Sequence, residues 1–396
     1  MSTRIPTSEI GIDPYGFAQT HLSAPARAVL ARLGEVLDRD VKPLLNQAWE
    51  TATMPAGILD ALIPLDLMRP AGVGAEEAAS SMFAGFRTYM LARADVSVAT
   101  VYNAQAGLFR AAVALGGSPE QAAHLADDVH SFGLKGVFAL TEPEHGSDVA
   151  GGMATRARRE GDEWVLTGAK RWIGGADAAD VIAVFARDEA DGQVKLFLVD
   201  RDAPGVDIEI IQGKISLRPM QNAIITLTDV RVPESKRLHG VNSWRDAARI
   251  LRTMRSDVSW IAAGLQAGAL EAALRYVTTR EQFGRPIGGF QLVQEKLARM
   301  LGNLTASLGM AVQLSTRQDA GEYSDDNSAL AKMMTALRAR ETVSLAREIL
   351  GGNGILLEND VARYFADAEA VYSYEGTHEI NALIVGRALT GQSAFV

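Results

Sequence analysis

The hydrophobic period of the chain changes twice, and this limits the fold more than any other feature. In residues 23–41, SAPARAVLARLGEVLDRDV, apolar residues recur every three or four positions, with Ser23 and Pro25 at a helix start. From 138 to 243, short β-branched or aromatic runs such as DVIAVFARD and VKLFLVDRD alternate with Gly, Asp and Pro. Helical spacing returns at 244 and continues. We expect an α+β fold with three domains, 1–137, 138–243 and 244–396, the last an antiparallel helical bundle able to self-associate.

Composition excludes several functions. The chain has 396 residues, 47% of them hydrophobic, and its net charge of -9 disfavours nucleic acid as a partner. The absence of cysteine excludes disulfides, thiolate metal sites and cysteine nucleophiles. No apolar stretch has membrane-spanning length, and the opening MSTRIPTSEIGIDPYGF lacks the pattern of a secretion signal. We therefore expect a cytoplasmic protein without a membrane partner.

Several common site types are missing from the sequence. The six histidines show neither an i, i+4 pair nor an acidic neighbourhood of metal-ligand type, so no metal centre is expected. The GGNG stretch at 351–354 lacks the third glycine of a dinucleotide loop and follows a helical run, not a strand. No GxSxG elbow and no P-loop occur, which disfavours serine hydrolases and P-loop nucleotide hydrolases.

The loop FALTEPEHGSDVAGG, residues 138–152, is a candidate binding segment. Backbone N–H groups around Gly146, with the hydroxyls of Thr141 and Ser147, could hold a phosphate or the edge of a heterocycle. The alternative is an ordinary turn, since Gly, Ser and Asp often cluster in turns. In the following KRWIGGAD, Trp172 could stack on a planar ring, but for this residue alone a place in the sheet's core is favoured.

Glu375 stands between an apolar run and a helix start in VYSYEGTHEINALIVGRALTG, residues 371–391. A carboxylate there is commonly a solvated group that favours the positive end of the helix dipole. Neighbours such as Tyr374 and Ile380 could instead desolvate it and raise its pKa towards the range of a general base.

Five motifs, taken together, show a resemblance. FALTEPEHGSD, KRWIG, REQFGRPIGGFQ, REILGGNG and YEGTHEINALIVGRALTG occur in the order and spacing of the acyl-CoA dehydrogenase family, from about residue 20 to the end. The last motif and KISLRPMQNA are most similar to the branch of glutaryl-CoA dehydrogenases and plant short-chain acyl-CoA oxidases. The resemblance implies an N-terminal helical domain, a middle β-barrel-like domain and a C-terminal four-helix bundle. It also implies FAD, a homotetramer built as a dimer of dimers, and electron transfer to an electron-transfer flavoprotein or a similar acceptor.

The resemblance assigns roles to individual residues. Glu375 matches the glutamate that removes the proton next to the thioester carbonyl, while its own backbone N–H and a flavin ribityl hydroxyl stabilise the enolate-like charge. The implied substrate-side residues are Ser147, Arg255, Gly376 and Phe395, and the alternative for Arg255 is a salt bridge on a helix surface. The implied FAD-binding residues are Phe138, Leu140, Thr141, Gly146, Ser147, Trp172, Gly174, Arg280, Phe283, Gln291, Glu348, Leu350, Gly351, Gly352, Thr377 and Glu379. Of these, Glu348 to Gly352 would come from a neighbouring subunit.

Three departures from the family pattern refine the expectation. Gly174 replaces a threonine beside the flavin, as in plant short-chain oxidases, and removes a hydroxyl while keeping the backbone N–H. Ala99 stands near the position of the arginine that glutaryl-specific members use for the distal carboxylate, and Arg93 aligns elsewhere. Glu348 and Glu379 replace glutamines of many members.

We therefore expect desaturation of a neutral short- or medium-chain acyl-CoA to the trans-2-enoyl-CoA. An unpaired distal carboxylate would cost glutaryl-CoA about 1 to 3 kcal/mol. The alternatives are an acyl-CoA oxidase, a flavin-binding scaffold without desaturase activity, and a substrate carried on an acyl carrier protein.

Overall fold

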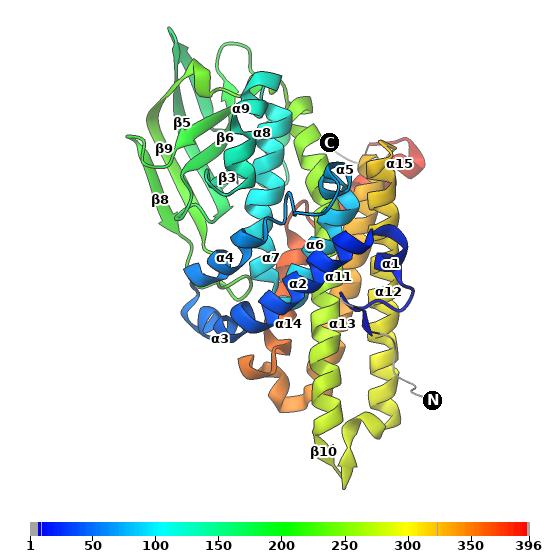
Figure 1. Cartoon of the computed structure of the whole chain (residues 1–396). Coiled ribbons are helices and arrows are strands. Elements are labelled where there is room, and N and C mark those ends of the chain that lie inside the picture. Colours follow the sequence, from blue (N-terminus) through cyan, green and yellow to red (C-terminus); the bar gives the residue numbers. More distant parts are fainter. Residues whose placement is uncertain (1–6, 9, 323, 394–396) are drawn as a thin grey trace. The chain divides into compact units, whose positions relative to one another are not determined.

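The computed structural model describes residues 7–8, 10–322 and 324–393, which form two compact units. The first unit contains residues 1–99, 215–219 and 255–396, and the second contains 100–214 and 220–254. Figure 1 shows helices at both ends of the chain and a sheet in its middle third. The helix, sheet, helix order predicted from the changes of hydrophobic period is therefore confirmed.

Short helices form the N-terminal part of the first unit. After the two-stranded ribbon of β1 (Thr7–Ser8) and β2 (Gly11–Ile12), the helices are α1 (Phe17–His21), α2 (Ala24–Val36), α3 (Lys42–Thr51), α4 (Ala56–Leu62), α5 (Ala75–Ala79), α6 (Ser81–Ala94) and α7 (Val96–Asn103, in the first unit up to residue 99). The predicted start at Ser23 is confirmed, since its hydroxyl accepts a hydrogen bond from the N–H of Ala26 at 3.2 Å. A π-helical turn over Leu37–Val41 joins α2 to α3.

Long helices make the C-terminal part. They are α11 (Trp244–Thr279, in the first unit from residue 255), α12 (Gln291–Asp319), α13 (Asp325–Leu350), α14 (Val361–Ser373) and α15 (His378–Thr390). The small hairpin of β10 (Glu281–Gln282) and β11 (Arg285–Pro286) joins α11 to α12. Within the bundle, α12 and α13 run side by side (Figure 1). Buried Gln266 of α11 donates to the Ser307 hydroxyl of α12 at 3.0 Å and to the Thr335 carbonyl of α13 at 3.4 Å.

Close contact between α6 and α11 depends on glycine. A Cβ atom added at Gly264 would lie 2.4 Å from the Tyr89 carbonyl oxygen, and one at Gly268 would lie 2.4 Å from that of Arg93. Any larger side chain at these two positions, one turn apart on α11, would therefore separate the helices.

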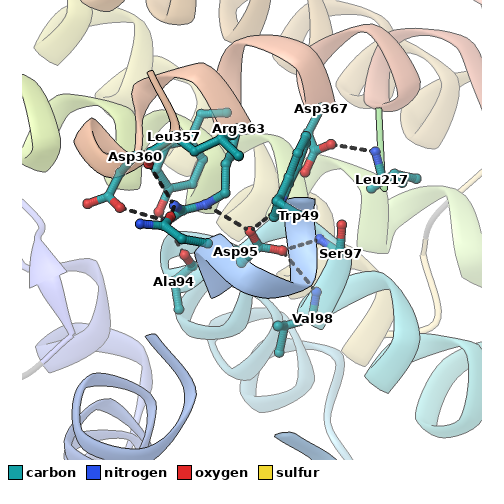
Figure 2. A network of polar contacts seen from close by, with 12 residues as sticks. Trp49, Ala94, Asp95, Ser97, Val98, Leu217, Leu357, Asp360, Arg363 and Asp367 are labelled. Atoms are coloured by element: carbon teal, nitrogen blue, oxygen red, sulfur yellow. Dashed lines mark hydrogen bonds and ion pairs between the residues drawn. The ribbon is translucent and has the colours of Figure 1, made fainter. Parts of the chain in front are cut away.

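A buried polar network fixes α14, the helix that leads to Glu375 (Figure 2). The Arg363 guanidinium lies 3.4 Å from the Asp95 carboxylate, which also accepts a hydrogen bond from the Trp49 indole at 3.0 Å. One turn further along, Asp367 accepts a hydrogen bond from the backbone N–H of Leu217 at 2.6 Å. The network thus joins α14 to the N-terminal helices and to the 215–219 segment, all within the first unit.

The second unit is built around a seven-stranded mixed sheet. Its strands are β3 (Gly136–Ala139), β4 (Arg156–Glu160), β5 (Glu163–Gly174), β6 (Val181–Asp188), β7 (Val194–Asp200), β8 (Val206–Ile210) and β9 (Asn222–Pro233). They pair in the order β3-β6-β4-β5-β9-β8, and β7 pairs with β6. Only the β3–β6 and β4–β6 pairs are parallel.

The sheet buries side chains in two cores. One joins Ile182 on β6, Phe197 on β7 and Ile225 on β9. The other packs β6 and β7 against α8 (Arg110–Gly116), α9 (Pro119–His130) and the first turns of α11. A short helix, α10 (Val149–Gly152), forms the last four residues of the 138–152 segment. The exact boundaries of the three expected domains remain a prediction. None of the described helices is long and apolar enough to cross a membrane.

Candidate active site

Glu375 lies on a tight turn between α14 and α15. Its φ is 55°, and that of Gly376 is 86°, so two successive residues have left-handed backbone. This conformation is costly for glutamate and is retained where the surroundings enforce it. The Thr377 hydroxyl then caps α15 by accepting a hydrogen bond from the Ile380 N–H at 3.2 Å.

Only glycine fits directly after Glu375. A Cβ atom at Gly376 would lie 3.0 Å from the amide nitrogen of Asn381, at a φ that other residues rarely adopt. That nitrogen donates to the carbonyls of Gly376 at 2.8 Å and Thr377 at 2.9 Å. Asn381 therefore holds the turn from the first turn of α15.

Glu375 is half-buried, and charges of both signs surround its carboxylate. Burial raises its pKa, the cations of Arg255 and Lys332 oppose the rise, and Asp257 adds to it. Among the residues that the structure describes, none donates a hydrogen bond to its carboxylate and none accepts one from its backbone N–H. An ionisable base and an N–H donor are thus adjacent and both open to a ligand. Glu375 is thus less exposed than a fully solvated carboxylate at a helix start.

Arg255 on α11 lies close enough to Glu375 to affect its pKa. Its side chain is 18% exposed and lies 3.9 Å from the Asp325 carboxylate. The interaction is a long ion pair in a partly buried place, so the helix-surface salt bridge does not account for the residue by itself.

Lys332 on α13 is a member of this site that the sequence reading missed. Its side chain is fully buried, and its ammonium donates to the carbonyls of Tyr372 at 2.7 Å and Gly376 at 2.8 Å. The sequence does hold a signal for it. Lys332 occupies one position of the i, i+3/i+4 stripe that α13 buries. That stripe includes Ser328, Ala329, Thr335, Ala336, Ala339, Val343 and Ala346.

The 138–152 loop of the second unit exposes the expected donors. Gly146 and Ser147 are exposed, Thr141 is half-buried, and a Cβ atom at Gly146 would meet nothing within 4 Å. The loop is fastened to β5, because the Arg171 N–H donates to the Thr141 carbonyl at 2.8 Å. Of the other two residues assigned to FAD here, Leu140 is buried in the core and Phe138 packs on Phe185 with ring centroids 4.9 Å apart. Leu140 could therefore meet a cofactor mainly through its backbone, whereas the Phe138 side chain is half-buried.

Trp172 is not a core residue, so the interpretation favoured for it alone is wrong. Its side chain is 52% exposed and its φ is 66°. The irregular pairing of β5 with β9 between Lys170 and Ile173 turns this side chain out of the regular alternation of the strand. An exposed indole beside open N–H and hydroxyl groups fits a planar heterocycle with a polar edge.

Gly174 ends β5 under close packing. A Cβ atom there would lie 1.9 Å from the terminal methyl of Met220, whose flexible side chain would have to shift. Because Gly174 has no side chain, the side chain of Met220 can fill the space next to it.

The remaining FAD candidates lie far from Glu375 within the first unit. Phe283, in the β10–β11 hairpin, is 95% exposed, and Gly351 and Gly352 are exposed after α13. Arg280 and Gln291 are exposed at the adjoining ends of α11 and α12, and Leu350 is buried. Glu348 pairs with Lys296 of α12 at 2.6 Å. Since Glu348 follows Lys332 by 16 residues of α13, the two lie about 24 Å apart along the helix.

The structure thus separates the candidates into three groups. Arg255, Glu375, Gly376, Thr377 and exposed Glu379 lie around one turn, the loop residues and Trp172 belong to the second unit, and the Phe283 group is remote. Phe395 lies outside the described residues.

Comparison with known proteins identifies the class. Residues 137–230 match the domain described as "Acyl-CoA dehydrogenase, middle domain", and residues 243–390 match "Acyl-CoA dehydrogenase, C-terminal domain". The chain is 34% identical to a probable acyl-CoA dehydrogenase of Bacillus subtilis over 71% of this chain and 77% of that one. It is 35% identical to a 3-(aryl)acrylate reductase of Clostridium sporogenes over 64% of this chain and 68% of that one.

A solved structure agrees over nearly the whole length. A glutaryl-CoA dehydrogenase from Mycobacterium smegmatis in complex with FADH2 has a TM-score of 0.89 and 31% identity, covering 96% of this chain and 97% of that one. The chain belongs to the acyl-CoA dehydrogenase family, whose members are oxidoreductases that act on the CH–CH group of acyl-CoA and use FAD. The family and the fold inferred from the five motifs are therefore confirmed.

Proposed function

We propose that the protein is an FAD-dependent dehydrogenase that converts a short- or medium-chain acyl-CoA to the trans-2-enoyl-CoA, with Glu375 as the base. The observation that carries the proposal is the Glu375 carboxylate itself. It has a raised pKa, accepts no hydrogen bond from a described residue, and stands on a turn held in a strained conformation. A carboxylate with only a structural role would be expected to have hydrogen-bonding partners.

The residues of the turn supply two elements of the chemistry. The Glu375 carboxylate accepts the proton from the carbon next to the thioester carbonyl. The backbone N–H of the same residue donates to the carbonyl oxygen, where negative charge develops. Arg255 and Lys332 oppose the effect of burial, so that the carboxylate is ionised often enough to act. Bound FAD supplies the hydride acceptor for the neighbouring carbon.

The exposed groups of the second unit suit the flavin. Thr141 and Ser147 would donate hydrogen bonds to it, and the indole of Trp172 would lie against its ring. The remote residues around Phe283 and Gly351 lie too far along the bundle to join the Glu375 turn of their own chain. The resemblance assigns them to the adenine and pyrophosphate portion at a subunit boundary, and we propose that this boundary belongs to a homotetramer.

A neutral acyl group fits better than a dicarboxylate. Ala99, near the expected position of a substrate-binding arginine, is fully buried. Arg93 is committed elsewhere, since its guanidinium pairs with Glu271 at 3.2 Å. The distal carboxylate of glutaryl-CoA would thus lack the bidentate cation that its desolvation requires.

An oxidase is the second candidate, and Gly174 is the observation that favours it. Without a hydroxyl at this position, the flavin-facing end of β5 offers only backbone donors. The dehydrogenase proposal expects slow reoxidation by oxygen and rapid reoxidation by an electron-transfer flavoprotein.

The test is anaerobic flavin bleaching with a panel of acyl-CoA thioesters. The panel holds butyryl-, hexanoyl-, octanoyl-, 3-phenylpropionyl- and glutaryl-CoA, the aromatic member because one relative is an arylacrylate reductase. We expect bleaching by neutral members and little by glutaryl-CoA. Rapid reoxidation in air with release of peroxide would replace the dehydrogenase by the oxidase. If neither any thioester nor an acyl carrier protein conjugate bleaches the flavin, the remaining hypothesis is a flavin-binding scaffold without desaturase activity.

A further inference from the structure

Lys332 connects two carbonyls on either side of Glu375. Its ammonium reaches the Tyr372 carbonyl in the last turn of α14 at 2.7 Å and the Gly376 carbonyl beyond the turn at 2.8 Å. The two bonds tie the end of α14 and the start of α15 to one point on α13. The chain between these anchors is only Ser373, Tyr374 and Glu375.

This tie acts where the backbone is least favourable. Left-handed backbone is unfavourable for glutamate and persists only where surrounding contacts enforce it. Asn381 enforces it from one side, since it also donates to the Gly376 carbonyl, at 2.8 Å. Lys332 is the second anchor and the only one of the two that is charged.

The charges around Lys332 come from α11, α13, α15 and the turn. Burial lowers its pKa to about 8, the carboxylates of Glu375 and Glu379 oppose this, and Arg255 adds to it. Asp257 on α11 faces the same carboxylate of Glu375, and Asp325 at the start of α13 lies 3.9 Å from Arg255. The ammonium therefore acts on Glu375 through space, while its hydrogen bonds go to neutral carbonyls.

We propose that Lys332 is a positioning residue of this site. Its ammonium fixes the turn that presents Glu375 and favours the ionised, proton-accepting form of that carboxylate. The inference rests on the proposed role of Glu375 as the base. It adds that the geometry and the ionisation of the base depend on one residue 43 positions earlier in the chain.

The test separates the donor from the charge. Lys332→Met removes both, Lys332→Gln keeps two N–H donors without charge, and Asn381→Ala removes neutral donors only. Lys195→Met is the matched control, a largely buried lysine of the second unit paired with Asp191 at 2.8 Å. For each, the rate of anaerobic flavin bleaching by the best thioester is followed from pH 5 to pH 9, with FAD content and Tm.

We expect Lys332→Met to slow bleaching at pH 7 by about 10- to 100-fold, because the base loses both placement and charge. The midpoint of the rise in rate should move to higher pH in Lys332→Met and Lys332→Gln, since less of the carboxylate is ionised without the cation. Asn381→Ala should slow bleaching without moving the midpoint. Lys195→Met should keep both.

An unmoved midpoint in folded, FAD-loaded Lys332→Met and Lys332→Gln would overturn the proposal, and a lowered Tm alone would mark Lys332 as merely structural. Loss of folding in both variants would overturn it as well, because the lysine would then serve the fold. Failure of the base assignment looks different: Glu375→Gln would bleach at the rate of the parent protein.

Discussion

Glu142 in the second unit and Glu375 in the first are both carboxylates close to a buried lysine, and their environments differ in one respect. Glu142 accepts hydrogen bonds from the Ala154 N–H at 2.6 Å, the Thr155 N–H at 2.9 Å and the Lys170 ammonium at 2.8 Å. Burial opposes its ionisation, but Lys170 and the hydrogen bonds from Thr155 and Ala154 together outweigh burial and hold the pKa of Glu142 low. Glu375 has a cation nearby and no hydrogen-bond donor among the described residues, and its pKa is raised.

The difference shows how one residue type serves structure or chemistry. The hydrogen bonds that Glu142 accepts all come from its own unit, and they fasten the 138–152 loop to β5. Its carboxylate therefore has a structural role with its hydrogen-bonding needs met. Lys332 donates its hydrogen bonds to backbone carbonyls and none to Glu375. The Glu375 carboxylate therefore remains available to accept a proton from the substrate. Removing the charge of Glu375 should therefore reduce activity without reducing stability. Removing the charge of Glu142 should mainly reduce stability.

The largest effect is expected for Glu375→Gln. It should slow anaerobic flavin bleaching by about 10²- to 10⁴-fold, the usual contribution of a positioned base. Tm should not fall, because the variant removes a carboxylate whose ionised form is disfavoured by burial. The sign follows from the raised pKa: native stability declines as pH rises through it, and the variant lacks this decline. Rapid-mixing absorbance and thermal melts at pH 6 and pH 8 measure both, and a large loss of Tm would contradict the contrast.

Glu142→Gln should show the reverse pattern. It leaves Lys170 buried without its carboxylate, which costs about 3 to 5 kcal/mol of stability. Denaturant unfolding at pH 7 measures the loss. Since the pKa of Glu142 is lowered, its contribution in the parent is present above the ordinary range of glutamate and disappears as pH falls through the native pKa. The gap between variant and parent should therefore close in acid, and a constant gap would argue against the ion pair as its cause.

Trp172→Ala tests the exposed face of the second unit. FAD affinity should fall about fivefold, equivalent to about 1 kcal/mol of lost ring contact. The apoprotein should keep its Tm, because the side chain is half exposed. Titration of apoprotein with FAD gives the affinity, and Tyr15→Ala, at a residue 75% exposed in the first unit, is the control. Equal affinities of variant and parent would remove Trp172 from the flavin site.

The smallest effect on activity is expected at Asp367, in the network behind α14 (Figure 2). Burial raises the pKa of this carboxylate, and Asp95 adds to the rise. Asparagine keeps an oxygen for the Leu217 N–H and removes the charge. Asp367→Asn should gain stability relative to the parent as pH rises, by about 1.4 kcal/mol for each unit of the pKa difference. Melts from pH 5 to pH 9 check this, and a gain at low pH only would reverse the sign.

The sequence predicted the order of elements and the family well, for identifiable reasons. The spacing of apolar residues changes sharply near residues 138 and 244. The start of α2 is predictable because Ser23 is a residue type that caps helices locally. Glu375 was predicted as the base because five motifs agree in register, and that role remains a proposal. Its left-handed φ could not be predicted, since that conformation depends on anchors from α13 and α15.

What the sequence did not show depends on contacts between distant residues. Arg363 meets Asp95 across 268 positions, and no local pattern indicates that pairing. Trp172 was misjudged because strand alternation assumes a regular pleat, and β5 is irregular at this residue. Lys332 sits in a buried stripe of mostly alanine, serine and threonine, which resembles an ordinary helix face unless each charged residue is checked for burial.

The most direct test of Glu375 as the base uses a neutral acyl-CoA that has deuterium at the carbon next to the thioester carbonyl. The account predicts that the label slows anaerobic flavin bleaching in the parent protein and that the enoyl product has lost one deuterium from that carbon. In Glu375→Gln with FAD bound, neither bleaching nor loss of the label should occur on the same timescale. Bleaching of Glu375→Gln at the parent's rate, with the same isotope effect, would contradict the account.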